Sequence, residues 1–261
     1  MEITLPKRRF QWFRWALRTY SPGLYGWMLS NTTLRRVFGR IKGKRRVIVG
    51  DEPANKFTAI YETHFWEDDE SRSGGGSNLY ATEKIRNAIP VLFRKYGIRS
   101  VLDVPCGDFV WFKEMQLEID SYAGGDIVIP LIKAVTDKYA SPMRSFRVMD
   151  LTKDRLPGCD LILVRDCFIH LSFDSIFAAL RNIAQSEIKY LLTTHYADAA
   201  VNVDIETGAW HAINLCKPPF ELQPAIELID DYAKGNAPRQ LGLWRIDELS
   251  RVASIRDFRP R

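Results

Sequence analysis

The most informative part of the chain reads Ser100-Val101-Leu102-Asp103-Val104-Pro105-Cys106-Gly107-Asp108-Phe109. It begins with a short apolar run, which predicts a buried strand over residues 100–104. The turn region, residues 103–109, contains one glycine and two acids. Upstream, apolar residues recur at helical spacing and Gly97 suits a C-terminal helix cap. A helix therefore precedes this strand, with its apolar face made by Ile85, Ile89, Leu92, Phe93 and Tyr96.

Strand and helix patterns then alternate along the rest of the chain. One predicted helix has Pro130 in its first turn, and another begins at Ser172. Strands separated by helices indicate a parallel sheet with right-handed crossovers. The expected fold is therefore α/β, a Rossmann-like seven-stranded, mostly parallel sheet with helices on both faces. The further expected strands are residues 121–128, 146–149, 160–164 and 189–194, with closing strands at 240–245 and 253–258.

Charge divides the chain into two parts. Residues 1–50 contain 12 basic residues and one acid, so they carry +11 and the remainder carries −6 of the formal net charge of +5. We expect a basic amphipathic extension over residues 1–50 and one catalytic domain over 51–261. Aromatic residues alternate with arginines in the extension, as in helices that meet anionic surfaces. Lipid docking, packing over the domain and nucleic-acid contact are the alternatives, and the acidic domain makes nucleic acid the least favoured.

Several classes of protein are disfavoured. No apolar run approaches the roughly 20 residues that span a bilayer, and the start of the chain lacks the features of a secretory signal. The four cysteines form no CxxC pair, which disfavours a zinc site and a disulfide scaffold. We expect a cytoplasmic protein without a metal, and docking of the extension would place it at the inner face of the membrane.

Acids follow four successive predicted strands: Asp103, Asp126, Asp150 and Asp166. In open α/β sheets, ligands bind beyond the carboxyl ends of the strands. A turn with one glycine is poorly suited to a dinucleotide pyrophosphate. Carboxylates instead attract a sulfonium and an ammonium group, which favours S-adenosylmethionine over NAD. For each acid, the alternative role is to cap the next helix.

Over residues 82–194 the chain resembles the class I S-adenosylmethionine-dependent methyltransferases. Residues 101–107 resemble that family's first motif in its D-x-x-C-G-x-G form. The resemblance implies that Asp103 and Gly107 line the methionine end of the cofactor and that Asp126 binds the ribose. Asp150 would accept from the adenine amino group, with Leu151 beside the ring. The remaining implied cofactor residues are Cys106, Phe109, Trp111 and Asp166.

The first motif departs from the family pattern at one position. Phe109 stands where the motif's last glycine usually lies, so the turn must follow a different path. Cys106 serves as a small residue in a tight turn. Trp111 either packs in the core or forms a wall of the methionine pocket. The glycine loop, residues 74–76, is either a plain linker or a lid over the cofactor.

Transfer to a hydroxyl acceptor requires removal of its proton, and a neutral imidazole is a suitable general base. His170 follows the fourth strand and is the first candidate, and His195 at the end of the fifth strand is the second. A structural hydrogen bond is the alternative for both. Asp166 is the third predicted catalytic residue, because it lies near the methionine moiety or the reacting centre.

Residues 202–220 form a long segment rich in Trp, Asn and Pro. Such long connections usually have a function, and aromatic and amide groups suit a sugar. We expect Trp210, His211 and Asn214 to bind the acceptor; the alternative is a structural cover for the sheet edge. This segment and residues 66–77 resemble methyltransferases found with bacterial polysaccharide-synthesis enzymes, which favours a glycan hydroxyl. A small molecule or nucleic acid as acceptor, an NAD-linked dehydrogenase and a noncatalytic binding module are the rivals.

Overall fold

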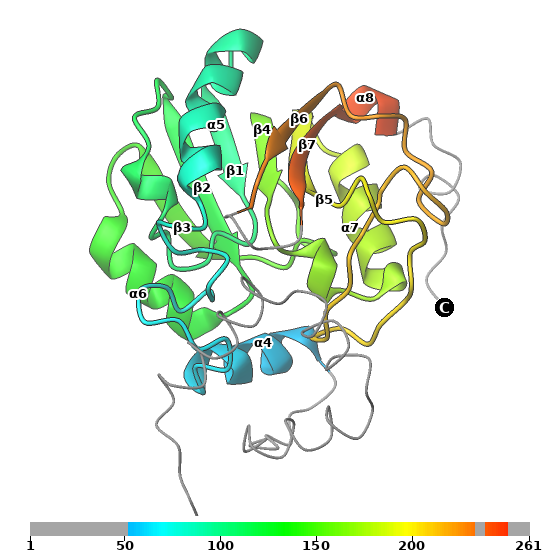
Figure 1. Ribbon diagram of the computed structural model, residues 1–261. Helices are drawn as coiled ribbons and strands as arrows, with labels where there is room; N and C mark the ends of the chain where they lie inside the picture. The colour runs from blue at the N-terminus through cyan, green and yellow to red at the C-terminus, as the bar shows by residue number, and fades with distance from the viewer. Residues whose placement is uncertain (1–51, 233–237, 250–261) are drawn as a thin grey trace, which may run out of the picture. The chain divides into compact units, whose positions relative to one another are not determined.

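A computed structural model of the chain describes residues 52–232 and 238–249, in which one mixed sheet has the strand order β3-β2-β1-β4-β5-β7-β6 (Figure 1). The strands β1 to β5 are parallel, whereas β7 pairs antiparallel with both β5 and β6. This confirms the predicted seven-stranded, mostly parallel sheet. The strands are β1 Ser100–Asp103, β2 Ser121–Asp126, β3 Arg144–Val148, β4 Cys159–Val164, β5 Ile188–His195, β6 Glu227–Asp230 and β7 Gln240–Arg245.

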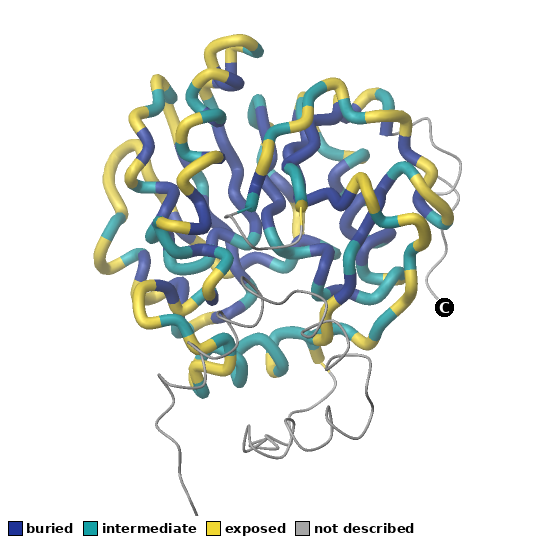
Figure 2. The backbone as a smooth tube through the Cα atoms, viewed as in Figure 1, coloured by how far each residue is buried: buried dark blue, intermediate teal, exposed yellow. Residues whose placement is uncertain are grey.

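The helices cover both faces of the sheet, as the alternation within β4 shows. Ile162 and Val164 pack with helix α7, and Leu161 and Leu163 pack in the other cluster with α5 and α6. Figure 2 shows the buried strands between more exposed helices. The helices are α4 Pro53–Glu62, α5 Glu83–Tyr96, α6 Ile129–Tyr139, α7 Phe173–Ala184 and α8 Ile246–Leu249, with short 3-10 helices η1 Phe112–Glu114 and η2 Phe168–His170.

Local sequence signals explain several helix boundaries. Gly97 ends α5 in the left-handed conformation, with φ of 63°, which a glycine adopts without strain. Pro130 lies in the first turn of α6, where no backbone N–H is needed. The Ser172 side chain accepts a hydrogen bond from the Ser175 N–H and so caps α7.

The antiparallel edge of the sheet was only partly predicted. Residues 240–245 form β7, as expected. The strand β6 was missed because it has only four residues, of which Leu228 is exposed at the sheet edge. The predicted strand 253–258 and the basic extension, residues 1–50, lie outside the described residues. Between residues 52 and 249, the described helices include none with the length and apolar character needed to span a bilayer.

Candidate functional site

A cavity of about 370 Å³ lies beyond the carboxyl ends of the parallel strands. Helix α4 lines it through Phe57 and Tyr61, and Figure 1 shows this helix crossing one end of the sheet. All four predicted strand-end acids line the cavity, as the topology requires. Six further predicted residues do so: Cys106, Gly107, Trp111, Leu151, His170 and Trp210.

Asp103 and Asp126 are buried carboxyl groups at the ends of neighbouring strands. Burial raises the pKa of Asp103 to about 7, although a 2.8 Å hydrogen bond from the Tyr122 hydroxyl opposes the shift. Burial likewise raises the pKa of Asp126 to about 6, against hydrogen bonds from the Val128 and Gly107 N–H groups. Both acids would therefore gain stability in the ionised form from a nearby cation.

Asp150 lines the cavity and also stabilises the turn that follows β3. Its carboxylate accepts from the Thr152 backbone N–H at 2.9 Å and from the Thr152 hydroxyl at 2.6 Å, and Lys153 lies 3.2 Å away. The side chain thus closes the turn after β3 while it lines the cavity. Within the described ranges, no group of three His, Cys, Asp or Glu side chains is arranged to hold a metal ion.

The turn that directly follows β1, here called the first turn, requires glycine at one position and contains phenylalanine at another. A Cβ on Gly107 would lie 2.4 Å from the Ser73 Oγ, and its φ is +55°. Phe109 has a φ of 61°, so it adopts the left-handed backbone expected of a glycine. Its side chain does not line the cavity, contrary to expectation, because it packs in an aromatic cluster with Phe112 and Tyr122.

Trp111 fits both of its predicted roles. Its side chain is buried, and it also forms part of the cavity wall. The guanidinium carbon of Arg165 lies 5.2 Å from the centre of its ring, a distance that allows a cation–π interaction.

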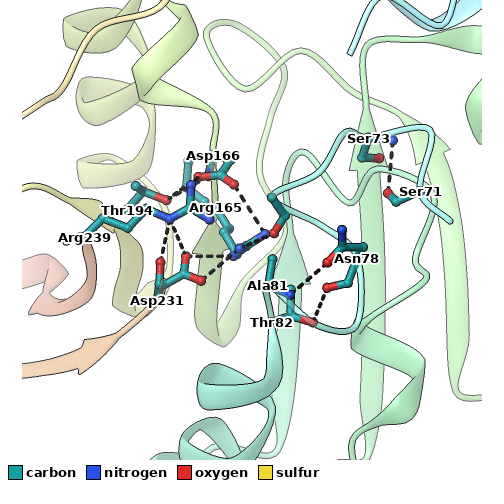
Figure 3. A network of polar contacts seen from close by, with 12 residues as sticks. Ser71, Ser73, Asn78, Ala81, Thr82, Arg165, Asp166, Thr194, Asp231 and Arg239 are labelled. Carbon is teal, nitrogen blue, oxygen red and sulfur yellow. Dashed lines mark hydrogen bonds and ion pairs between the residues drawn. The ribbon is translucent and has the colours of Figure 1, made fainter. Parts of the chain in front are cut away.

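Residues 71–77, which include the glycine loop, form part of the cavity wall and are hydrogen-bonded to the first turn. The Asp108 carboxylate accepts from the Ser71 hydroxyl at 3.0 Å and from the Arg72 N–H at 2.7 Å. The Asp108 N–H in turn donates to the Ser73 Oγ at 3.0 Å. Figure 3 shows Ser71 and Ser73 on this loop. Residues 72–77 line the cavity, so the loop is more than a plain linker.

A buried network of two arginines and two aspartates lies at the end of β4 (Figure 3). Arg165 donates to both carboxylate oxygens of Asp231 at 2.9 Å and to the Gly76 carbonyl at 2.7 Å. Arg239 Nη1 lies 3.0 Å from Asp166 Oδ1. Burial alone would raise the pKa of Asp166, but the two guanidinium groups lower it below its ordinary value. Asp166 is therefore an ion-paired carboxylate rather than a proton acceptor.

His170 has the geometry of a neutral base. Its Nδ1 lies 2.8 Å from the Ala209 carbonyl oxygen. Because a carbonyl only accepts, Nδ1 carries the hydrogen and Nε2 keeps its lone pair. The ring stacks on Trp66 with centroids 5.3 Å apart, and burial lowers the pKa of His170. The ring therefore remains neutral at pH 7.

The segment 202–220 orients His170 more than it lines the cavity. The Gly208 N–H donates to the His170 carbonyl at 2.8 Å, and the His211 N–H donates to the Ile169 carbonyl at 3.0 Å. The His211 ring is buried between the Val203 and Phe168 carbonyls. These contacts fasten the segment to η2.

Besides Phe109, three predicted site residues lie outside the cavity for identifiable reasons. Both ring nitrogens of His211 contact backbone carbonyls, as described above. Asn214 is buried and donates to the Ala197 and Ala199 carbonyls at 2.9 and 3.0 Å, so its amide fixes the loop. His195 accepts from the Leu215 N–H at 3.3 Å, and burial lowers its pKa to about 4. Of the predicted acceptor residues, Trp210 alone lines the cavity.

Comparison with known proteins places the fold. No protein-family model matches the chain, and neither does any curated protein sequence. The N-methyltransferase NodS from Bradyrhizobium japonicum WM9, solved with S-adenosyl-L-homocysteine, is a similar structure with a TM-score of 0.54 and 14% identity, over 73% of this chain and 98% of that one. Magnesium protoporphyrin IX methyltransferase from Synechocystis PCC 6803, with bound SAM, gives a TM-score of 0.52 and 10% identity, over 74% and 97% of the two chains.

A third similar structure is human N-acetylserotonin methyltransferase in complex with SAM. Its TM-score is 0.52 at 14% identity, and the match covers 84% of this chain and 68% of that one. Identities this low show a common fold. The chain therefore has the Rossmann-like fold of class I methyltransferases, as its sequence predicted.

Proposed function

We propose that this protein is a methyltransferase that uses S-adenosylmethionine. The observation that carries the proposal is the lining of the cavity, in which four carboxylates from successive strand ends surround a turn with a single glycine. Such a lining attracts a cationic nucleoside and repels a pyrophosphate. Three structures of the same fold contain this cofactor or its demethylated product. When bound, the cofactor supplies an electrophilic methyl group on a sulfonium.

The residues of the cavity suit the parts of this cofactor. Asp126 would hold the ribose hydroxyls, and Asp150 with Leu151 would hold the adenine. Asp103 and Gly107 would line the amino-acid end, where a carboxylate with a raised pKa can exchange its proton for a cationic partner. Holding the reacting groups in line can account for a large part of the acceleration.

His170 is the proposed general base for a hydroxyl acceptor. Its Nε2 is the ring nitrogen free to take a proton, since Nδ1 is occupied by Ala209. Asp166 would position the guanidinium groups of Arg165 and Arg239 at the end of β4, because its ion pair with Arg239 keeps it ionised. His195 is not retained in this role, because it lies outside the cavity.

A sugar hydroxyl is the proposed acceptor. Trp210 lines the cavity with 56% of its surface exposed, so its ring is available to stack on a sugar. The names of the similar enzymes describe an N-methyltransferase and enzymes for a porphyrin and for N-acetylserotonin. The proposal of a sugar acceptor is therefore supported by Trp210 and by the composition of the segment 202–220. We place the reaction in the cytoplasm, with contact to anionic lipid through residues 1–50.

Calorimetric titration with S-adenosylmethionine, S-adenosylhomocysteine and NAD tests the proposal. We expect the first two to bind in the micromolar range and NAD to show no measurable heat. Incubation with methyl-labelled cofactor and separated glycans, small molecules and nucleic acids then identifies the acceptor. Absence of binding by both sulfur compounds would refute the function, and binding without transfer to any fraction would favour a noncatalytic module.

A further inference from the structure

Three arginines line the cavity, and two of them are neutralised by carboxylates. Arg165 is paired with Asp231, and Arg239 is paired with Asp166. Arg72 differs from both, because no carboxylate in the described part of the chain forms an ion pair with its guanidinium. It is therefore the cavity-lining cation that is available to a ligand.

The structure fixes Arg72 without using its charged donors. The backbone N–H of Arg72 donates to Asp108 Oδ2 at 2.7 Å, which holds the residue against the first turn. Its guanidinium carbon lies 5.2 Å from the centre of the Tyr61 ring in α4. An aromatic face restrains a guanidinium and leaves its N–H groups free for a planar anion.

We propose that Arg72 is the carboxylate-binding residue of this cavity. The inference rests on the proposed function and adds a ligand contact to it. Elsewhere the cavity lining is rich in carboxylates, such as Asp103, Asp126 and Asp150, which would repel an anion. A single carboxylate matches the fork of an arginine through two parallel hydrogen bonds. The α-carboxylate of the cofactor and the carboxylate of an acidic sugar are the two sources of this chemistry.

The experiment compares two cofactor forms that differ in one group. S-adenosylmethionine carries the carboxylate, whereas its decarboxylated form keeps the ammonium and the sulfonium but lacks it. We expect Arg72→Gln to weaken the binding of S-adenosylmethionine by about tenfold, as for the loss of one charge-assisted hydrogen bond in an accessible site. The affinity for the decarboxylated form should not change. Arg72→Lys should restore part of the affinity. Arg94→Gln, an exposed change on α5 away from the cavity, controls for net charge.

A second arm tests the acceptor as the source of the carboxylate. Glucuronate and glucose are titrated by NMR against the protein saturated with S-adenosylhomocysteine. If the acceptor supplies the carboxylate, Arg72→Gln leaves both cofactor forms unaffected and weakens glucuronate but not glucose. The proposal is overturned if Arg72→Gln changes neither the affinity for S-adenosylmethionine relative to its decarboxylated form nor the affinity for glucuronate relative to glucose. It is also overturned if the variant binds both cofactor forms equally more weakly. If the wild-type protein binds neither cofactor form, the proposed function itself fails, which is a separate outcome.

Discussion

His170 combines a fixed tautomer with a depressed pKa, and this combination leads to a kinetic prediction. We expect His170→Ala to lower kcat by about a hundredfold to ten-thousandfold, the usual contribution of a general base. Cofactor affinity should not change, because the role proposed for Nε2 is to take a proton from the acceptor. Asp126→Ala is the matched comparison and should abolish cofactor binding. Equal loss of cofactor binding in both variants would contradict the role of His170.

The pH dependence of the wild-type protein follows from the same residue. Burial lowers the pKa of His170 from its ordinary value near 6.5. A base must be neutral, so kcat should fall as pH is lowered, with the midpoint of this acid limb below 6.5. This acid limb should be absent from the residual activity of His170→Ala. A limb centred well above 6.5 would show that another group controls the reaction.

Asp103 predicts a proton released on cofactor binding. Burial raises its pKa to about 7, so part of the population is protonated at neutral pH. A cationic ligand stabilises the carboxylate and lowers that pKa, so binding releases protons and affinity rises with pH between 6 and 8. Titration in two buffers of different ionisation enthalpy measures the release. Asp103→Asn should reduce the release to what Asp126 contributes, and identical heats in both buffers for the wild type would contradict the prediction.

Sequence alone could place the acids and put His170 before His195, but it could not show the contacts that separate the two histidines. The end of a parallel strand fixes where the next side chains lie, so Asp103, Asp126 and Asp166 were predictable at the cavity. His170 and His195 both lie at the ends of strands, so the order of preference came from the strand that each one follows. The difference comes from loop contacts: Ala209 orients the first, and Leu215 binds the second.

At the scale of elements, the glycine loop supports the base through Trp66. Gly74 has a φ of +95°, and a Cβ there would lie 2.9 Å from the Trp66 Cβ. Gly74→Ala should therefore shift Trp66 and with it the stacked His170 ring. We expect a fall in Tm, with a backbone penalty of about 1–2 kcal/mol, together with a fall in kcat.

Gly97→Ala is the matched control for this loop. Gly97 also has a positive φ, of +63°, but a Cβ there would meet nothing within 4 Å. This variant should lower Tm through backbone strain alone and leave kcat unchanged. If Gly74→Ala also left kcat unchanged, the link from the loop to His170 would be wrong.

The predictability of elements follows their periodicity. The parallel strands β1 to β5 were predicted as short runs among helical patterns, although no helix separates β3 from β4. The edge strand β6 has alternating partly exposed residues and no helix beside it in sequence, which leaves no comparable signal. Asp231 and Arg239, which border this edge, were missed for the same reason, although they complete the network at β4.

At the scale of the whole chain, the separation of charge leads to a prediction about membranes. Residues 1–50 carry +11, whereas the rest carries −6. We expect the full chain to bind vesicles that contain anionic lipid and to be released by salt, since exposed charges are screened. Changing Arg8, Arg9, Arg14 and Arg18 to Gln should weaken this binding in a sedimentation assay.

Two controls make the vesicle test specific. Arg94→Gln, which lies in α5 and outside the extension, should bind as the wild type does. Vesicles of neutral lipid alone should retain little protein. Unchanged binding by the variant in the extension would show that this segment has another role.

The attachment of residues 208–211 to η2 has a consequence for protein engineering. The carbonyl that orients the proposed base belongs to Ala209, the neighbour of Trp210, which lines the cavity. On the roles proposed above, a loop transplanted from another protein should change the choice of acceptor and displace His170 in the same step. Libraries that seek new acceptors should randomise the Trp210 side chain and keep the backbone on either side of it intact.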